Sequence, residues 1–381
     1  MKKINFKNIK GYIEGYYGKL LSWNDRIKIL KTLRDNDMKF YFYCPKEDIY
    51  QRLHWRNKYN KEWAKSFNLF CNVAKNYNIN VIAGISPGLD FDFESLITEK
   101  KHDLNLINDK LIFFLEHGAS YTSILFDDIP NNFEKKFGLE NEGVFHAKII
   151  NEISKNIKEN IFAVPRIYSD ELNKENPYYI KNFLKNLNKD IFIFYCGKYI
   201  VSKNFKSDFK IIKDKIEKGL IINWDNFYAN DYCPKRLIIG PWKNQNLIEK
   251  SMINGTGNIF TDNLILEIIN KTKNKKNKIS IWKSILTNHG VPKDFFQICK
   301  YFLSPGFTFE NKIKKITYNE KFLLNIENLL WRWKSPLSRE WYPYLLNLKH
   351  DLQILNNELT FNRILKTQTN PLQIKFKRGD N

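Results

Sequence analysis

The chain has 381 residues, of which 43% are hydrophobic and 15% aromatic, so it can build a large core and is not disordered overall. It contains no run of 18 or more apolar residues, and we expect no membrane-spanning helix. The N-terminal MKKINFKNIKGYIEGYYG has no apolar stretch behind its lysines. We therefore expect no secretory signal and a cytoplasmic location, or a secreted one if a signal has been removed.

The charge balance is strongly basic, with 62 Lys and Arg against 41 Asp and Glu and a net charge of +21. Such a charge favours polyanionic partners and raises the possibility of nucleic-acid binding. However, the lysines are spread along the chain and cluster only in NKTKNKKNK, residues 270–278, which we interpret as a solvated loop. We expect no nucleic-acid partner.

The five cysteines are scattered and odd in number, and none forms a CxxC pair. This pattern is typical of reduced thiols rather than of a disulfide framework or a zinc site. The residues concerned are Cys44, Cys71, Cys196, Cys233 and Cys299.

Eight short apolar runs, bounded by Gly, Pro or polar residues, predict strands. Their nearly continuous apolar character is typical of parallel strands that are covered on both faces. In chain order they start at GYIEG and cover about residues 11–15, 39–46, 80–88, 123–128, 161–165, 191–197, 220–226 and 251–254.

Helical patterns separate these runs. The first follows Ser22, which with Asp25 resembles a helix N-terminus, and its apolar residues then recur at helical spacing. Further helices are predicted at about 62–77, 104–117, 143–160, 177–186 and 203–218, and the segment NLILEIIN follows the eighth strand. Eight strand–helix units predict a (β/α)8 TIM barrel, with a doubly wound open sheet as the alternative.

Beyond about residue 279 the pattern becomes purely helical. One apolar stripe comprises Phe322, Ile326, Leu329, Leu330 and Trp333, and a heptad-like series comprises Leu345, Leu348, Leu352, Leu355 and Leu359. We expect a catalytic barrel over residues 1–278 and a C-terminal helical domain over residues 279–381. Core packing is the role we favour for this second domain.

Polar and aromatic side chains gather at the predicted strand ends, where the active site of a barrel lies. They are Gly15, Tyr17, Lys46, Asp127, Asp128, Tyr168, Trp224, Asn226 and Asp231.

The segment SILFDDIP, residues 123–130, places two adjacent aspartates at the end of a strand. A turn there would let both carboxylates reach one pocket, where each would push the other's pKa away from its own. One could stay ionised while the other served as a general acid and base. A helix cap, a turn or Mg²⁺ ligation are alternative roles for such a pair.

Glycoside hydrolysis uses carboxylate pairs in this way. In most retaining enzymes the second carboxylate is a nucleophile about 5–5.5 Å from the acid. Neighbours in sequence suit that opposed arrangement poorly. They suit substrate assistance better, in which the sugar's own 2-acetamido oxygen attacks the anomeric carbon.

Six motifs, in order and spacing, resemble the catalytic domain of glycoside hydrolase family 84, the β-N-acetylglucosaminidases. They are GYIEGYYG (11–18), YCPKED (43–48), HWRNKY (54–59), GISPGLD (84–90), ILFDDI (124–129) and NWDNFYANDYCPKRLIIGPW (223–242). The resemblance covers about residues 9–270. It implies a (β/α)8 barrel that uses neither a metal ion nor another cofactor.

The resemblance also implies residue roles. Asp127 is similar to the residue that orients and polarises the acetamido group, and Asp128 to the general acid and base. Tyr168, Trp224 and Asn226 would form the acetamido pocket.

The remaining positions would bind the rest of the sugar. The resemblance gives Gly15, Lys46 and Asn254 as contacts to sugar hydroxyls and Asp231 as the partner of the 4- and 6-hydroxyls. Tyr17 joins them at the end of the first strand.

The sequence thus predicts a retaining exo-β-N-acetylglucosaminidase that acts on terminal N-acetylglucosamine of a glycoconjugate through an oxazoline intermediate. A non-catalytic glycan-binding protein on the same barrel is the alternative, and a basic nucleic-acid-binding protein has only the net charge in its favour. The aglycone is left open among O-GlcNAc proteins, hyaluronan fragments, mucin glycans and cell-wall sugars, and the sequence predicts no particular oligomeric state.

Overall fold

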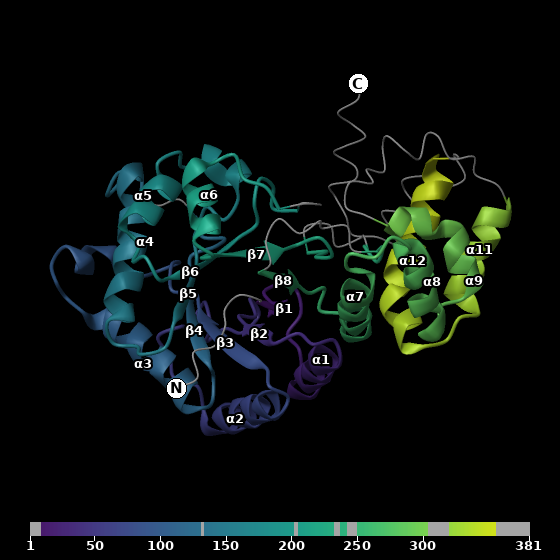
Figure 1. The fold of residues 1–381 in the computed structure, drawn as a ribbon, viewed down its shortest axis with the longest axis horizontal. Coiled ribbons are helices and arrows are strands. Elements are labelled where there is room, and N and C mark those ends of the chain that lie inside the picture. Colours follow the sequence, from purple (N-terminus) through teal and green to yellow (C-terminus); the bar gives the residue numbers. More distant parts are fainter. Residues whose placement is uncertain are drawn as a thin grey trace. The chain divides into compact units, whose positions relative to one another are not determined.

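Eight parallel strands form a closed barrel in sequence order, from β1 to β8, with β8 pairing to β1 (Figure 1). The computed structural model describes residues 9–130, 133–201, 205–231, 237–241, 250–303 and 320–355. The closed order confirms the predicted (β/α)8 barrel and rules out a doubly wound open sheet, which would have two unpaired edges.

The strands are short and almost entirely buried, as their apolar sequences predict. Nearly every strand residue has its side chain covered, because one face is turned to the barrel interior and the other to the helices. The strands are β1 (Lys10–Glu14), β2 (Phe40–Tyr43), β3 (Asn80–Ile85), β4 (Tyr121–Leu125), β5 (Ile161–Val164), β6 (Phe192–Tyr195), β7 (Ile221–Asp225) and β8 (Ser251–Asn254).

Helices surround the strands (Figure 1). The first begins as predicted, since the Ser22 hydroxyl accepts a hydrogen bond from the Asp25 amide at 3.1 Å. The helices between and after the strands are α1 (Trp23–Asp35), α2 (Lys61–Asn76), α3 (His102–Glu116), α4 (Leu139–Ser154), α5 (Tyr179–Asn186), α6 (Lys210–Glu217) and α7 (Ile259–Thr272), with short 3-10 helices η1 (Phe93–Leu96) and η2 (Asp170–Lys174).

Two helices differ from prediction. Helix α4 ends at Ser154, six residues before the expected end. Helix α6 begins at Lys210 rather than near 203, because Asp170 binds the residues in front of it. The Asp170 carboxylate accepts hydrogen bonds from the Ser207 hydroxyl at 2.9 Å and from the Asp208 amide at 2.6 Å, which holds this stretch out of the helix.

The barrel interior is filled by residues that alternate along the strands, as the two-residue period requires. On β6 and just beyond it, Phe192, Phe194 and Cys196 point inward, and on β7 Ile222 and Trp224 do the same. The last residue of each such row lies at the carboxyl end of the barrel. The floor of any site at that end is therefore the top layer of the core.

The described residues divide into two compact units: the barrel, which extends to Trp282, and a helical unit of residues 283–303 and 320–355 to which residues 237–240 also belong. Helix α8 (Lys278–Asn288) spans the division, and the predicted boundary between residues 278 and 279 falls at its start. The other helices of the second unit are α9 (Lys293–Ile298), η3 (Cys299–Phe302), α11 (Glu320–Trp331) and α12 (Pro336–Leu355).

In the helical unit, α11 packs against α9 and α12. The predicted stripe is buried at Phe322, Ile326, Leu329 and Leu330, with Trp333 buried just after the helix, and Leu345, Leu348 and Leu352 are buried on α12. The side chain of Leu355 and all of Leu359 lie outside the described residues.

Three composition-based expectations can be compared with the described residues. None of the helices in this part of the chain combines the length and apolarity needed to cross a membrane. The four cysteines described there are free, and Cys233 lies outside that part. Of the lysine-rich run, residues 270–272 finish α7 and residues 274–277 are exposed, so it is only partly a loop.

Candidate active site

A pocket of about 310 Å³ opens at the carboxyl ends of the strands. It contains every predicted site residue except Lys46, so β1, β4, β5, β6, β7 and β8 or the loops after them all contribute. The residues that line it are Gly15, Tyr17, Asp127, Asp128, Val164, Tyr168, Phe194, Cys196, Trp224, Asn226, Asp231 and Asn254.

The turn after β4 brings the two aspartates into this one pocket. Asp128 has a φ of 55°, in the left-handed region that non-glycine residues seldom adopt. Continued strand geometry would send two successive side chains to opposite faces. The turn lets both line the same pocket instead, as the sequence predicted.

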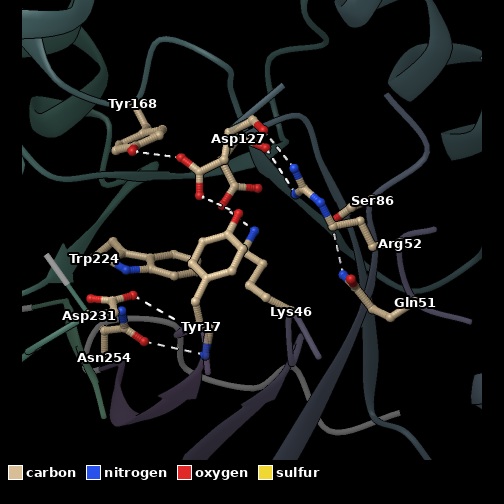
Figure 2. Close-up of polar contacts among 12 residues, drawn as sticks. Tyr17, Lys46, Gln51, Arg52, Ser86, Asp127, Tyr168, Trp224, Asp231 and Asn254 are labelled. Atoms are coloured by element: carbon tan, nitrogen blue, oxygen red, sulfur yellow. Dashed lines mark hydrogen bonds and ion pairs between the residues drawn. The ribbon is translucent and has the colours of Figure 1, made fainter. Parts of the chain in front are cut away.

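Asp128 is held by two phenols. The Tyr17 hydroxyl donates a hydrogen bond to Oδ2 of Asp128 at 3.0 Å, and the Tyr168 hydroxyl donates to Oδ1 at 2.9 Å (Figure 2). Burial, followed by the negative charge of Asp128, raises the pKa of Tyr17, so its phenol keeps its proton and stays a donor. Both carboxylate oxygens of Asp128 are thereby fixed in direction.

Asp127 has a different environment, being only 5% exposed. The Lys46 ammonium lies 2.5 Å from its Oδ2 atom, whereas its buried Oδ1 atom has no hydrogen-bond partner within the described residues. Burial raises the pKa of Asp127, the nearby charge of Lys46 acts against that rise, and the charge of Asp128 adds to it. The two neighbours therefore occupy unlike electrostatic environments.

Lys46 is itself buried and stands behind Asp127 rather than in the pocket lining. In this structure its ammonium group contacts a carboxylate and not open pocket space.

Trp224 forms a pocket wall whose position is set by amides. Its Nε1 atom donates to Oδ1 of Asn226 at 3.0 Å, and Nδ2 of Asn254 donates to the same oxygen at 3.0 Å. Asn254 in turn accepts from the Gly15 amide at 3.3 Å through its Oδ1 atom. This chain of bonds links the ends of β7, β8 and β1.

Asp231 completes the rim, where its Oδ2 atom accepts a hydrogen bond from the Tyr17 amide at 3.4 Å (Figure 2). The pocket thus combines carboxylates and amides with an apolar wall, as sites for sugars do.

Sequence reasoning missed four residues of the site. Val164, Phe194 and Cys196 line the pocket, and the two-residue alternation along β5 and β6 could have found them. Arg52 donates to the main-chain carbonyls of Asp127 and Asp128, and no sequence signal pointed to it.

The described residues contain no group of three or more His, Cys, Asp or Glu side chains arranged to hold a metal ion.

Comparison with known proteins places this site in a family. The family model described as beta-N-acetylglucosaminidase matches residues 10–258. The protein O-GlcNAcase of Mus musculus is 30% identical over 240 residues, which are 61% of this chain and 26% of that protein. That of Rattus norvegicus is 29% identical over 247 residues, again 61% of this chain and 26% of the relative. The match thus spans about a quarter of either relative.

Solved structures share the fold. A mutant of the Thermobaculum terrenum O-GlcNAc hydrolase superposes with a TM-score of 0.70 at 21% identity, covering 91% of this chain and 82% of that one. The structure of CpGH84B gives a TM-score of 0.69 at 21% identity, covering 93% and 70%. Because the family model covers well over half of the chain and every barrel strand, the chain belongs to the β-N-acetylglucosaminidases, glycoside hydrolase family 84.

Proposed function

We propose that this chain hydrolyses terminal β-linked N-acetylglucosamine with retention of configuration, using the sugar's own acetamido group as the nucleophile. The observation that carries the proposal is the buried Asp127 carboxylate in the pocket, whose Oδ1 atom has no partner among the described residues. A buried acceptor without a donor costs about 1–3 kcal/mol, so the site favours a ligand that supplies an N–H group. The amide of a 2-acetamido sugar is such a donor.

In the first step, Asp127 accepts the acetamido N–H and turns the amide oxygen towards the anomeric carbon. That oxygen forms a bond to the anomeric carbon while the glycosidic bond breaks, and Asp128 gives its proton to the departing oxygen. The product of this step is an oxazolinium ion, or an oxazoline once its N–H proton has passed to Asp127. The positive charge of Lys46 beside Asp127 favours the ionised carboxylate that the first step requires.

In the second step, Asp128, now a carboxylate, takes a proton from water as the water oxygen attacks the anomeric carbon. The bond to the acetamido oxygen breaks, and the amide regains its N–H proton. Two inversions at one carbon give N-acetylglucosamine in the β configuration. Tyr17 and Tyr168 hold Asp128 by its two oxygens in both steps.

The rest of the pocket suits the sugar ring. Asp231 and Asn254 offer polar atoms to hydroxyl groups, and Gly15 offers its main-chain carbonyl. The wall of Trp224, with Val164, Phe194 and Cys196, suits the acetamido methyl group. Lys46 is buried against Asp127 and reaches a sugar hydroxyl only if a bound sugar draws the ammonium forward.

For the aglycone, we favour the serine or threonine of an O-GlcNAc protein, because the mouse and rat relatives are named protein O-GlcNAcases. A glycan-binding protein without catalysis is the alternative. The pocket holds both the unpartnered Oδ1 atom of Asp127 and the accessible carboxylate of Asp128. This favours an enzyme, because binding alone requires no proton donor beside the glycosidic oxygen.

The nucleophile can be tested with aryl glycosides whose 2-acetamido group carries zero to three fluorines on its methyl carbon. Each fluorine withdraws electrons from the amide oxygen, so we expect log kcat to fall steeply and steadily along the series. A rate independent of fluorine content would contradict substrate assistance. NMR of the first-formed anomer checks retention separately.

A further inference from the structure

The segment that follows β2 contacts the two aspartates in two different ways. Its Lys46 pairs with the side chain of Asp127. Six residues later, Arg52 donates from one guanidinium nitrogen to the main-chain carbonyl of Asp127 at 3.3 Å and from the other to that of Asp128 at 2.6 Å (Figure 2). Only the second contact acts on the backbone of the turn.

Arg52 is unusually placed for a charged residue, because it is only 7% exposed. In the part of the chain that the structure describes it forms no ion pair, whereas buried arginines are generally paired with carboxylates. Its forked donors serve two successive carbonyls instead. Its charge also lowers the pKa of Asp127, against the effect of burial.

The two carbonyls that Arg52 binds are those on either side of the Asp128 Cα atom. Fixing both fixes the two peptide planes that meet there, and hence the φ and ψ angles of Asp128. Asp128 has the left-handed φ of 55°, a conformation that residues other than glycine seldom adopt. The two bonds from Arg52 favour this backbone angle over the alternatives.

The support for Arg52 is itself rigid. Its neighbour Gln51 donates from Nε2 to the Ser86 hydroxyl at 2.9 Å (Figure 2). The Ser86 amide in turn donates to the Gln51 carbonyl at 2.9 Å. The buried Lys110 of α3 donates to the Tyr50 carbonyl at 2.8 Å. Residues 50–52 are thus tied to the end of β3 and to α3.

We propose that Arg52 is a positioning residue for the hydrolysis described above: by binding the carbonyls of Asp127 and Asp128 it holds the left-handed turn that aims both carboxylates into the pocket. It touches neither carboxylate's reacting atoms. The expected effect of Arg52 on the reaction rate rests on the proposed function. Its expected effect on the backbone of Asp128 rests on the hydrogen bonds alone.

The test compares Arg52→Ala and Arg52→Lys with the wild type on an aryl β-N-acetylglucosaminide. Misaimed carboxylates should lower kcat of Arg52→Ala by about 100-fold. KM should change less than kcat, because the hydroxyl contacts assigned to Gly15, Asp231 and Asn254 come from other strand ends. Added guanidinium should restore part of the rate of Arg52→Ala. Arg52→Lys keeps the charge but not the forked donors, so its kcat should lie between those of Arg52→Ala and the wild type.

Arg56 offers a matched control on the same segment. It pairs with Asp90 and Asp103, away from the turn, so Arg56→Ala should lower stability while kcat of the folded protein is retained. If the wild type is active, the positioning role would be overturned by a kcat of Arg52→Ala within about threefold of the wild-type value. It would also be overturned if guanidinium restored no activity to Arg52→Ala. An inactive wild type would overturn the proposed function instead.

A crystal structure of Arg52→Ala, or of Arg52→Lys if the alanine variant does not fold, gives a readout that needs no activity. We expect the φ angle of Asp128 to leave the left-handed region, or the main chain at Asp127 and Asp128 to become disordered. An unchanged φ at Asp128 would overturn the proposal even if the rate had fallen.

Discussion

Two aspartates that are neighbours in sequence receive unlike surroundings. Asp127 is buried beside an ammonium group with one oxygen unpartnered, and Asp128 faces the pocket with each oxygen held by a phenol. In the proposed mechanism, this difference lets one carboxylate accept a hydrogen bond from the substrate amide while the other exchanges a proton with the leaving group. A single left-handed residue, Asp128, brings both into one pocket.

Gly15 gives a prediction at the residue scale. A Cβ atom there would lie 2.5 Å from Cζ2 of Trp224, whose indole is bonded to Asn226 and cannot move freely. We expect Gly15→Ala to displace the pocket wall, with a cost on the order of 1–3 kcal/mol in transition-state stabilisation measured as kcat/KM.

Gly18→Ala is the control for Gly15→Ala. No atom lies within 4 Å of the added Cβ, but the φ of 85° strains an alanine, so stability alone should fall. Equal kcat/KM for Gly15→Ala and the wild type would contradict the role of Trp224 as a fixed wall.

Where a motif named the position, the structure brings the predicted residues together, and their roles stay predictions. The paired aspartates, Tyr168, Trp224 and Asn254 all line the predicted pocket. Prediction failed for Arg52, because a contact between a side chain and two carbonyls depends on where a loop returns in space. No local pattern in that loop encodes such a contact.

At the scale of elements, several loops at the carboxyl end are anchored by buried carboxylates. Glu14, at the end of β1, forms a two-pronged ion pair with Arg26 of α1, and Asp262 of α7 binds the Tyr12 hydroxyl and the amides of Thr256 and Gly257. These bonds fix the ends of β1 and β8 and the residues after them, beside Gly15 and Asn254. The site is therefore preorganised by its supports.

After β2 the anchor is Asp48, whose carboxylate accepts hydrogen bonds from the hydroxyls of Tyr43 at 2.7 Å and Tyr59 at 2.9 Å. After β5 it is Glu142 of α4, which pairs with Arg166, two residues before Tyr168. The main-chain amide of Arg166 also donates a hydrogen bond to the Tyr179 hydroxyl at 2.9 Å. Each anchor ties a loop at the carboxyl end of the barrel to a helix or strand.

Lys110 gives a prediction at this scale. Burial lowers the pKa of Lys110 to about 8, and the charge of Asp48 acts against that shift. The ammonium donates to the carbonyls of Tyr50 and Asn57. An unfolded lysine titrates near 10.4. Between about pH 8 and 10.4 the unfolded state binds more protons, so this group makes the free energy of unfolding rise with pH by on the order of 3 kcal/mol.

Lys110→Met should abolish that rise, although it also leaves two carbonyls without a donor and so lowers stability at every pH. The measurement is urea unfolding of both proteins at several pH values from 7 to 10, with Lys65→Met, an exposed lysine of α2, as a control for the loss of one charge. A constant difference between Lys110→Met and the wild type over this range would contradict the prediction.

Element boundaries were predicted well where local chemistry decides them, as at the Ser22 cap of α1. They were predicted less well where a distant residue intervenes. Asp170, on η2, holds residues 207 and 208 out of α6, and neither the periodicity nor the composition of that segment reveals it.

At the scale of the whole molecule, the strand–helix alternation predicted the barrel but left a doubly wound sheet as the alternative, and the pairing of β8 with β1 decides between them. Eight strands that are apolar on both faces leave no edge to expose once β8 pairs with β1. The same closure explains why six strand ends can share one pocket. The helical unit was predicted from its apolar stripes.

The central claim is that Asp127 and Asp128 divide the work of one reaction. The most direct test is kcat/KM for the wild type, Asp127→Asn and Asp128→Asn on aryl β-N-acetylglucosaminides with a good and a poor leaving group. Asp128→Asn should lose far more on the poor leaving group, which needs the proton, by about 100-fold or more. Asp127→Asn should lose about 100-fold on both, because the acetamido group is no longer oriented. Equal losses for Asp128→Asn on the two substrates, or a fully active Asp127→Asn, would contradict the account.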